Sequence, residues 1–460
     1  MGSIMTIVSI DGLFVPFLEG GLARKRLQEI EGELRHAHRE LMSRRGKDID
    51  FYDVPLATTV IKTVTTEVTR LRSLADDLLV LGIGGSSLGG QAIHSALCGT
   101  ADRSFRVHFV DNIDPDTLSS LLERLDPAKT ATAVISKSGT TVETLALLLI
   151  VRRWFRVSLG KGEMRSRMTA VTGTEDSLLR ELCQAEGIRV FEIPTHVAGR
   201  YSALTAVGLL PAAFVGIDIG ALLEGAASMV KKVTADDVLD NPACILAAGG
   251  WLASHDLGRT SLVMMPYCDA LRTTTAWFVQ LWGESLGKRR NRLGEEVRTG
   301  QTPIPAVGAT DQHTQLQLFL EGPRDKAVML VEVAKHRSLL PIPDELEERE
   351  EATFLHGRDL SEILDAERRA TRAALLEGGV PVIDVVLPVL DPARMGALLV
   401  LFQAACATTG IMLGVNPFDQ PGVEESRRMA LGLLGRPGYE SEAKRVLLRE
   451  SPRRGPEGID

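Results

Sequence analysis

The sequence is poor in cysteine and has no pair of cysteines at the spacing of a metal or redox site. Its 460 residues include five cysteines, an odd number, scattered along the chain with no C-x-x-C. This distribution argues against a disulfide framework and against a cysteine-ligated metal. It favours free thiols in a reducing compartment.

Excess positive charge and long apolar runs are also missing. The formal net charge is −8, which argues against a nucleic-acid-binding surface. Residues 1–20 lack a basic segment followed by an uninterrupted apolar one, so we expect no secretory signal. The most apolar late stretch, 396–413, contains Gln403, Thr408 and Thr409 and indicates a buried helix rather than a membrane span. We expect a cytoplasmic protein that binds neither nucleic acid nor membrane.

What the sequence does have is a regular alternation of short apolar runs and helical patterns. The stretch 20–75 is polar and helical in pattern. Strands are predicted at 77–85, at 105–112 and near 130, 167 and 189, and a looser second series is predicted near 260, 326 and 380. Helical patterns between the strands indicate parallel, doubly wound sheets in two α/β domains.

Glycines and hydroxyls follow two of these strands. "GIGGSSLGG", residues 82–90, ends the first strand, and "SKSGTT", residues 136–141, ends the third. Glycines let a backbone approach an anion, hydroxyls donate hydrogen bonds to it, and Lys137 adds charge. We predict a cradle for one phosphate. One alternative is a dinucleotide site that uses Asp111, but Ser87 stands where the G-x-G-x-x-G motif needs its third glycine. The second alternative is that these serines and threonines only cap a helix.

A carboxylate suited to proton transfer lies on a predicted helix at 272–288. Glu284 falls on the face that carries Trp277 and Leu281, so its carboxylate should be partly desolvated, as suits a general base. Alternatively, it is a partly buried glutamate paired with Lys288 or Arg272.

Three further residues are candidates for the same chemistry. His313, in "GATDQHTQLQL", is either a catalytic or a structural histidine. Arg200, in "GRYS", follows the fifth strand and either stabilises an oxyanion or forms a cap or salt bridge. Arg427, in a helix that begins near Pro421, shares a face with apolar residues, whereas Glu424 and Arg428 should form a surface pair. An inward cation is either a buried salt bridge or a ligand contact.

Six segments in order, from about residue 82 to 431, resemble the glucose-6-phosphate isomerase family in its bacterial form: "GIGGSSLGG", "SKSGTTVETL", "GRYS", "WFVQLWGESLGK", "GATDQHTQLQL" and "NPFDQPGVE". The resemblance implies two sugar-isomerase (SIS) domains with parallel-sheet cores and terminal helices. We expect an N-terminal helical segment that packs on the second domain (1–60) and a first SIS domain that binds phosphate (61–205). A second SIS domain (206–415) and a C-terminal helix with a tail (416–460) should follow.

The resemblance also implies an activity: reversible aldose–ketose isomerisation of glucose 6-phosphate and fructose 6-phosphate, in glycolysis and gluconeogenesis, without metal or organic cofactor. Glu284 would move a proton through a cis-enediolate that Arg200 stabilises. His313 would assist ring opening together with Arg427 and would come from the partner subunit of a homodimer. The substrate-binding residues would be Gly85, Ser86, Ser136, Lys137, Ser138, Thr141, Thr144, Glu143, Gln280 and Gln420.

Two positions depart from the family pattern. Arg427 stands where the family has a lysine, and arginine does not give up its proton at working pH; Ala198 stands where a glycine usually precedes "GRYS". The alternative function is therefore a phosphosugar-binding SIS protein with impaired catalysis. A preference for another phosphosugar, such as mannose 6-phosphate, also stays open.

Overall fold

The computed structural model describes residues 6–100, 104–345 and 349–450. The chain forms two compact units, residues 1–417 and 418–460. The tail expected after residue 450 lies outside the described residues. The five cysteines form no disulfide within the described chain.

The first sheet is parallel throughout and has five strands in the order β3-β2-β4-β5-β6. Their bounds are β2 Asp77–Leu81, β3 Arg106–Val110, β4 Thr130–Ser136, β5 Met168–Gly173 and β6 Arg189–Ile193. Every residue of β2, β4 and β5 is buried, as strands covered by helices on both faces require. The sequence prediction of this sheet is confirmed.

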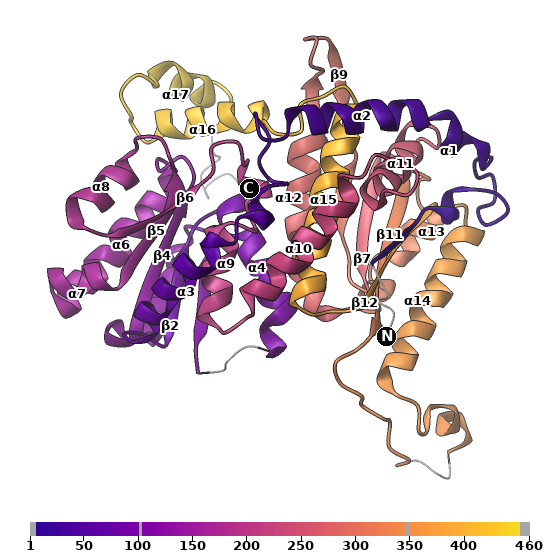
Figure 1. Ribbon diagram of the computed structural model, residues 1–460, viewed down its shortest axis with the longest axis horizontal. Coiled ribbons are helices and arrows are strands. Elements are labelled where there is room, and N and C mark those ends of the chain that lie inside the picture. The colour runs from indigo at the N-terminus through magenta and orange to yellow at the C-terminus, as the bar shows by residue number, and fades with distance from the viewer. Residues whose placement is uncertain (1–5, 101–103, 346–348, 451–460) are drawn as a thin grey trace, which may run out of the picture. The chain divides into compact units, whose positions relative to one another are not determined.

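Helices cover both faces of the first sheet (Figure 1). On one face, α6 and α8 bury Leu147, Phe155 and Leu179 against β2, β4 and β5. The opposite face carries α3, α4 and α9. The bounds are α3 Thr59–Arg72, α4 Leu88–Leu97, α5 Pro115–Arg124, α6 Val142–Leu159, α7 Lys161–Ser166, α8 Leu178–Glu186 and α9 Ala206–Phe214.

The second sheet also has five strands, in the order β1-β12-β11-β7-β10. Only β1 runs antiparallel to its neighbour. The bounds are β1 Ile7–Ser9, β7 Ser261–Pro266, β10 Thr302–Pro305, β11 Lys326–Lys335 and β12 Val382–Val389. A separate hairpin pairs β8 Lys288–Arg290 with β9 Glu296–Thr299. The sequence predicted β7, β11 and β12 but neither β1 nor β10.

A layer of helices lies between the two sheets (Figure 1). In this layer α12 packs against α4 on one side and against β7 and β10 on the other, and α15 packs against α10 and α11. The first unit's remaining bounds are α1 Lys25–Glu29, α2 Glu31–Arg44, α10 Ile219–Val233, α11 Pro242–His255, α12 Arg272–Leu286, α13 Leu316–Glu321, α14 Leu360–Glu377 and α15 Pro392–Met412.

The longest apolar helix, α15, is long and apolar enough to cross a membrane. However, 89% of its apolar window is buried within the protein. The sequence prediction of a buried helix at 396–413 is therefore confirmed, with α15 beginning slightly earlier.

The second unit contains α16 Pro421–Leu433 and α17 Glu440–Leu447. Arg428 pairs with Glu442 across these two helices. In the first unit, β1 pairs with β12 and α2 packs on α15. The four divisions expected from the sequence, at 1–60, 61–205, 206–415 and 416–460, stay a prediction.

Candidate active site

The predicted phosphate cradle lies at the topological switch point of the first sheet. In this sheet β3 lies on one side of β2, and β4 lies on the other side. The strand order therefore reverses at β2. Ligands of doubly wound proteins bind beyond the carboxyl ends of strands at such a point. The loop after β2 and the loop after β4 both begin there, which brings the two halves of the predicted cradle together.

Each loop of the cradle contains a glycine in a left-handed conformation. Gly84 has φ +56° in the short helix η3, Gly84–Ser86, and Gly139 has φ +61°. A Cβ on Gly139 would lie 2.1 Å from the Ser177 hydroxyl oxygen. Glycine at 139 is therefore required both by its conformation and by the space around it.

The hydroxyls of the second loop hydrogen-bond to one another at the start of α6. Ser136 Oγ lies 3.0 Å from Thr141 Oγ1, and Ser138 Oγ lies 3.3 Å from the same atom. The Gly139 backbone N–H donates to Ser136 Oγ at 3.2 Å. Thr144 is buried, and its hydroxyl has no hydrogen-bond partner among the described residues. The result is a preorganised group of donors at a helix N-terminus, where anions are favoured.

Lys137 extends from the same loop toward the segment that follows β6. Its Nζ donates to the Thr195 carbonyl oxygen at 2.8 Å. Burial lowers the pKa of Lys137, and the charge of Glu175 partly opposes that shift. An ammonium in this position is poorly solvated, so a phosphate anion would be a favourable partner for it.

The cradle is packed against the loop that carries Arg200. A Cβ on Gly85 would lie 2.4 Å from the carbonyl carbon of Gly199, in the short helix η6, Gly199–Tyr201. The Ser202 hydroxyl donates to the Gly199 oxygen at 2.6 Å and approaches the Gly85 oxygen at 3.3 Å. The two loops therefore form one rigid contact, in spite of Ala198 at the position where the family pattern has glycine.

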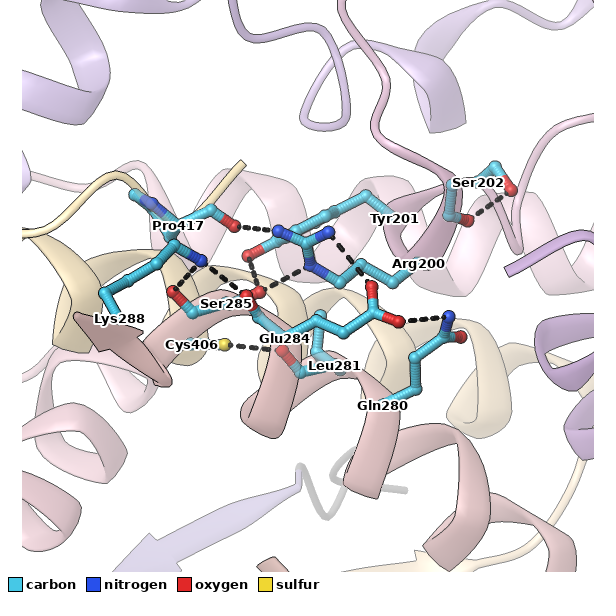
Figure 2. Close-up of polar contacts among 11 residues, drawn as sticks. Arg200, Tyr201, Ser202, Gln280, Leu281, Glu284, Ser285, Lys288, Cys406 and Pro417 are labelled. Atoms are coloured by element: carbon cyan, nitrogen blue, oxygen red, sulfur yellow. Dashed lines mark hydrogen bonds and ion pairs between the residues drawn. The ribbon is translucent and has the colours of Figure 1, made fainter. Parts of the chain in front are cut away.

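Arg200 is a buried cation that faces Glu284 (Figure 2). Its side chain is only 1% exposed, whereas that of Glu284 is 31% exposed. Nη1 of Arg200 lies 3.2 Å from Glu284 Oε2, Nε donates to Ser285 Oγ at 2.8 Å, and Nη2 donates to the Pro417 carbonyl oxygen at 2.7 Å. Sequence spacing did not reveal this ion pair, because 84 residues separate its members.

Glu284 lies on α12 one turn after Gln280, whose Nε2 donates to Glu284 Oε1 at 3.1 Å. The helix buries Trp277 and Leu281, as expected. The alternative partners considered for Glu284 are both wrong. Lys288 donates to the backbone carbonyl oxygens of Glu284 and Ser285, and Arg272 pairs with Asp269 at 2.8 Å.

Gln280 also connects the base to the cradle. A Cβ on Gly84 would lie 3.0 Å from Gln280 Nε2. The Gln280 oxygen is buried and has no hydrogen-bond partner among the described residues. The Gln280 side-chain oxygen is thus an acceptor beside the Glu284 carboxylate that a sugar hydroxyl could use. Glu143 lies in the first turn of α6, partly exposed.

His313 does not join this group within one chain. It is exposed at the end of the short helix η8, Thr310–His313. Its neighbours hold the turn: Asp311 accepts from the Val307 N–H at 2.7 Å, and Gln312 donates to the Tyr267 hydroxyl at 2.7 Å. No hydrogen bond or ion pair in the described chain joins His313 to Arg200 or Glu284.

Arg427 lies on α16, in the second unit. Its side chain is 43% exposed and pairs with Glu424, three residues earlier, at 2.7 Å. Arg428 pairs with Glu442 instead of Glu424. Gln420 is exposed at the N-terminal end of α16, which begins at Pro421 as predicted. The catalytic role of Arg427 and the substrate contact of Gln420 stay predictions.

Sequence reasoning missed Ser285 and Tyr201, whose hydroxyls lie beside Arg200. Both side chains are buried, and their oxygens lie 3.4 Å apart. The one sequence signal was a serine directly after the candidate base on the buried face of its helix. That signal is weak, because buried serines are common in helices that pack closely.

Comparisons with known proteins identify relatives that align over most of the chain. The family model for phosphoglucose isomerase matches residues 66–442. A glucose-6-phosphate isomerase of Carboxydothermus hydrogenoformans is 39% identical, with 97% of this chain and 98% of that protein aligned. Another, from Rubrobacter xylanophilus, is 39% identical over 92% of this chain and 97% of its own.

Solved structures show the same architecture. A hypothetical protein of Thermus thermophilus has a TM-score of 0.85 at 34% identity, covering 94% of this chain and 100% of its own. A glucose-6-phosphate isomerase of Chlamydia trachomatis, at 23% identity, has a TM-score of 0.80 over 93% of this chain and 90% of its own, and shares the fold.

One parallel sheet and one sheet that is parallel except for β1, with the predicted cradle at the switch point of the first, define an α/β protein of the sugar-isomerase (SIS) class. The family model that matches most of the chain identifies the family within this class. The chain belongs to the phosphoglucose isomerase family.

Proposed function

We propose that the protein catalyses the reversible isomerisation of glucose 6-phosphate and fructose 6-phosphate. The observation that carries this proposal is the pairing of Glu284 with the buried Arg200, directly beside a cradle suited to phosphate. Relatives named glucose-6-phosphate isomerase that align over nearly the whole chain support it.

In the proposed mechanism, the cradle and Lys137 hold the phosphate and thereby fix the distance from it to the reacting carbons. A Glu284 oxygen removes the proton from C2 of the open-chain aldose, and the electrons move to the carbonyl oxygen to form a cis-enediolate. Glu284 then returns the proton to C1, the hydroxyl proton of O2 moves to O1, and C2 becomes the carbonyl carbon of the ketose. Arg200 stabilises the charge that develops on the enediolate oxygens, and Gln280 lies against the sugar.

Ring opening is assigned to His313 and Arg427. The exposed position of His313 supports its donation to the site of a partner subunit, so we propose a homodimer. Arg427 would act there as a fixed cation, since arginine does not release its proton at working pH. Gln420 and Glu143 complete the proposed sugar site, and the protein is proposed to work in the cytoplasm.

The alternative, a phosphosugar-binding protein with impaired catalysis, has little to support it. Binding alone requires no carboxylate beside a buried arginine. The relatives aligned over most of the chain carry the enzyme's name, and none of the comparisons supports a loss of catalysis.

The test is conversion of fructose 6-phosphate to glucose 6-phosphate by the purified protein in the presence of a chelator, beside the variant Arg427→Lys. We expect turnover by the native chain, with the variant within about tenfold of it, because the cation is kept. If the native chain is inactive and lysine restores turnover, the protein is a binding protein descended from an enzyme.

A further inference from the structure

The hydroxyl of Ser285 is an anchor for the arginine of the active site. It accepts a hydrogen bond from Arg200 Nε at 2.8 Å, and Ser285 is 0% exposed. Figure 2 shows it on the side of the guanidinium away from the Glu284 carboxylate. The Ser285 hydroxyl therefore contacts Arg200 at Nε, whereas Nη1 is the nitrogen that faces the carboxylate.

The orientation of the Arg200 guanidinium depends on acceptors at separate nitrogens. Nη1 faces the Glu284 carboxylate, Nη2 faces the Pro417 carbonyl oxygen and Nε faces Ser285. In the proposed reaction Glu284 gains and loses a proton, so its attraction for the arginine changes at each step. The Ser285 hydroxyl keeps the same charge throughout and can hold the guanidinium plane fixed while the enediolate forms.

The base and this anchor are adjacent residues on one turn of α12, and that turn is itself restrained. Lys288, which is only 6% exposed, donates to the carbonyl oxygens of both Glu284 and Ser285. A cation at this end of a helix is favourable. The geometry that relates Glu284 to Arg200 is therefore set by a short, rigid stretch of backbone.

Two ionisable groups beside Ser285, the Tyr201 hydroxyl and the Cys406 thiol, are kept neutral by burial. The Tyr201 hydroxyl lies 3.4 Å from Ser285 Oγ, and burial raises the pKa of Tyr201 well above its usual range. Cys406 is buried in the same cluster, where its Sγ donates to the Leu281 carbonyl oxygen at 3.3 Å, and burial raises its pKa to about 11. Neither group introduces a negative charge that would draw Arg200 away from the substrate.

We propose that Ser285 is a positioning residue for the isomerisation: it holds Arg200 in the orientation that stabilises the enediolate, without touching the substrate. This inference rests on the proposed function. It predicts that losing the hydroxyl weakens stabilisation of the transition state and leaves phosphate binding intact, which is a change in kcat with little change in KM.

The experiment compares the native enzyme with Ser285→Ala. We expect kcat to fall about tenfold to a hundredfold while KM stays within about twofold. Two ligands provide a second readout: a hydroxamate phosphate that mimics the enediolate, and a hexitol 6-phosphate that offers only phosphate and hydroxyls. The hydroxamate should lose affinity by about the same factor as kcat, and the hexitol phosphate should bind within about twofold of its native affinity.

The matched control is Thr274→Val on the same helix. The Thr274 hydroxyl is also buried, but it has no hydrogen-bond partner among the described residues. This variant should leave kcat and both affinities unchanged. The conservative variant Ser285→Thr keeps the acceptor oxygen and should recover most of the lost kcat.

Three results would overturn the positioning role. They are an unchanged kcat in Ser285→Ala, an equal loss of affinity for both ligands, and an equal effect of Thr274→Val. The first two leave the proposed isomerase in place, because the native enzyme is then still active. If the native chain itself gives no turnover, the proposed function fails and the role of Ser285 fails with it.

Discussion

At the scale of single residues, the carboxylate of Glu284 is the group on which the proposed chemistry depends. Glu284→Gln keeps the size of the side chain and leaves an oxygen that can accept from Arg200, but it removes the base. We expect turnover to fall by at least about 10²- to 10⁴-fold, with binding of the hexitol 6-phosphate nearly unchanged. Steady-state rates and calorimetric titration measure the two effects.

A second arginine–glutamate pair provides the control for that variant. Nη2 of Arg152, on α6, lies 2.5 Å from Oε1 of Glu186, on α8, and both side chains are largely buried. Glu186→Gln should leave kcat and KM unchanged. The role of Glu284 is wrong if its glutamine variant loses sugar-phosphate binding while turnover per bound substrate persists.

If Lys137 binds the phosphate as proposed, phosphate binding should depend on pH. Burial lowers the pKa of Lys137, so the ammonium loses its proton at a lower pH than an exposed lysine would. The charged form binds phosphate, so KM should be constant below that pKa and should rise as the pH rises through it. Measurement of KM from neutral pH to about pH 10 covers the expected range.

The control for the pH effect is Lys137→Arg. A guanidinium keeps its charge throughout this range, so the alkaline rise in KM should disappear in this variant. If the arginine variant shows the same rise, another group causes it.

The sequence identified most of the side chains at this site but not their partners. Glycines, hydroxyls and Lys137 are recognisable because they follow strands directly, and chain order alone then places them at the edge of a sheet. The ion pair of Arg200 with Glu284 and the contact of Arg200 with Ser285 form only when α12 packs beside the first sheet. Local patterns carry no information about such contacts between distant residues.

At the scale of elements, the loop between β4 and α6 depends on the backbone of Gly139. An alanine there would meet Ser177 and would have to adopt φ +61°. We expect the distorted cradle to bind phosphate less tightly, and a loss of about 1.4 kcal/mol would raise KM about tenfold. Kinetics of Gly139→Ala, with a thermal melt, test this prediction.

Gly187 gives a matched control for the loop. It also has a left-handed conformation, with φ +68°, but a Cβ there would have no atom within 4 Å. Gly187→Ala should cost stability of about 1–2 kcal/mol and leave KM unchanged. An equal rise in KM in both variants would mean that the effect of Gly139 is one of stability only.

The elements that sequence patterns missed are those at the margins of the second sheet. β10 has the sequence TPIP, and two prolines normally argue against a strand. It lies at the edge of the sheet, where proline is tolerated because one side of the strand needs no ladder hydrogen bonds. β1, with only three residues, is too short to show a period. The buried strands of the first sheet, in contrast, are rich in apolar and β-branched residues and were predictable from composition.

At the scale of the whole molecule, the exposed His313 raises the question of which chain completes the site. The imidazole has no contact with Arg200 or Glu284 in the described chain, although we propose that all three act on one substrate. In a twofold-symmetric dimer, a residue given to the partner's site is matched by the same residue received in return. Each site would then combine Glu284 of one chain with His313 of the other.

Subunit complementation tests this arrangement. We would co-express Glu284→Gln and His313→Ala chains with different tags and isolate the mixed dimer. If His313 crosses the interface, one site of that dimer lacks both groups and the other has both intact, so we expect about half of the native activity. Dimers of either variant alone should be inactive.

The matched control pairs a native chain with a chain that carries both substitutions. If His313 crosses the interface, each site of this dimer lacks one group, and the dimer should be inactive. If His313 acts within its own chain, the native chain keeps a complete site and the dimer retains about half of the native activity, while the first mixed dimer is inactive. The two mixed dimers therefore give opposite results for the two arrangements. Because both dimers carry the same two substitutions, the difference in their activities reports only which chain supplies His313 to each site.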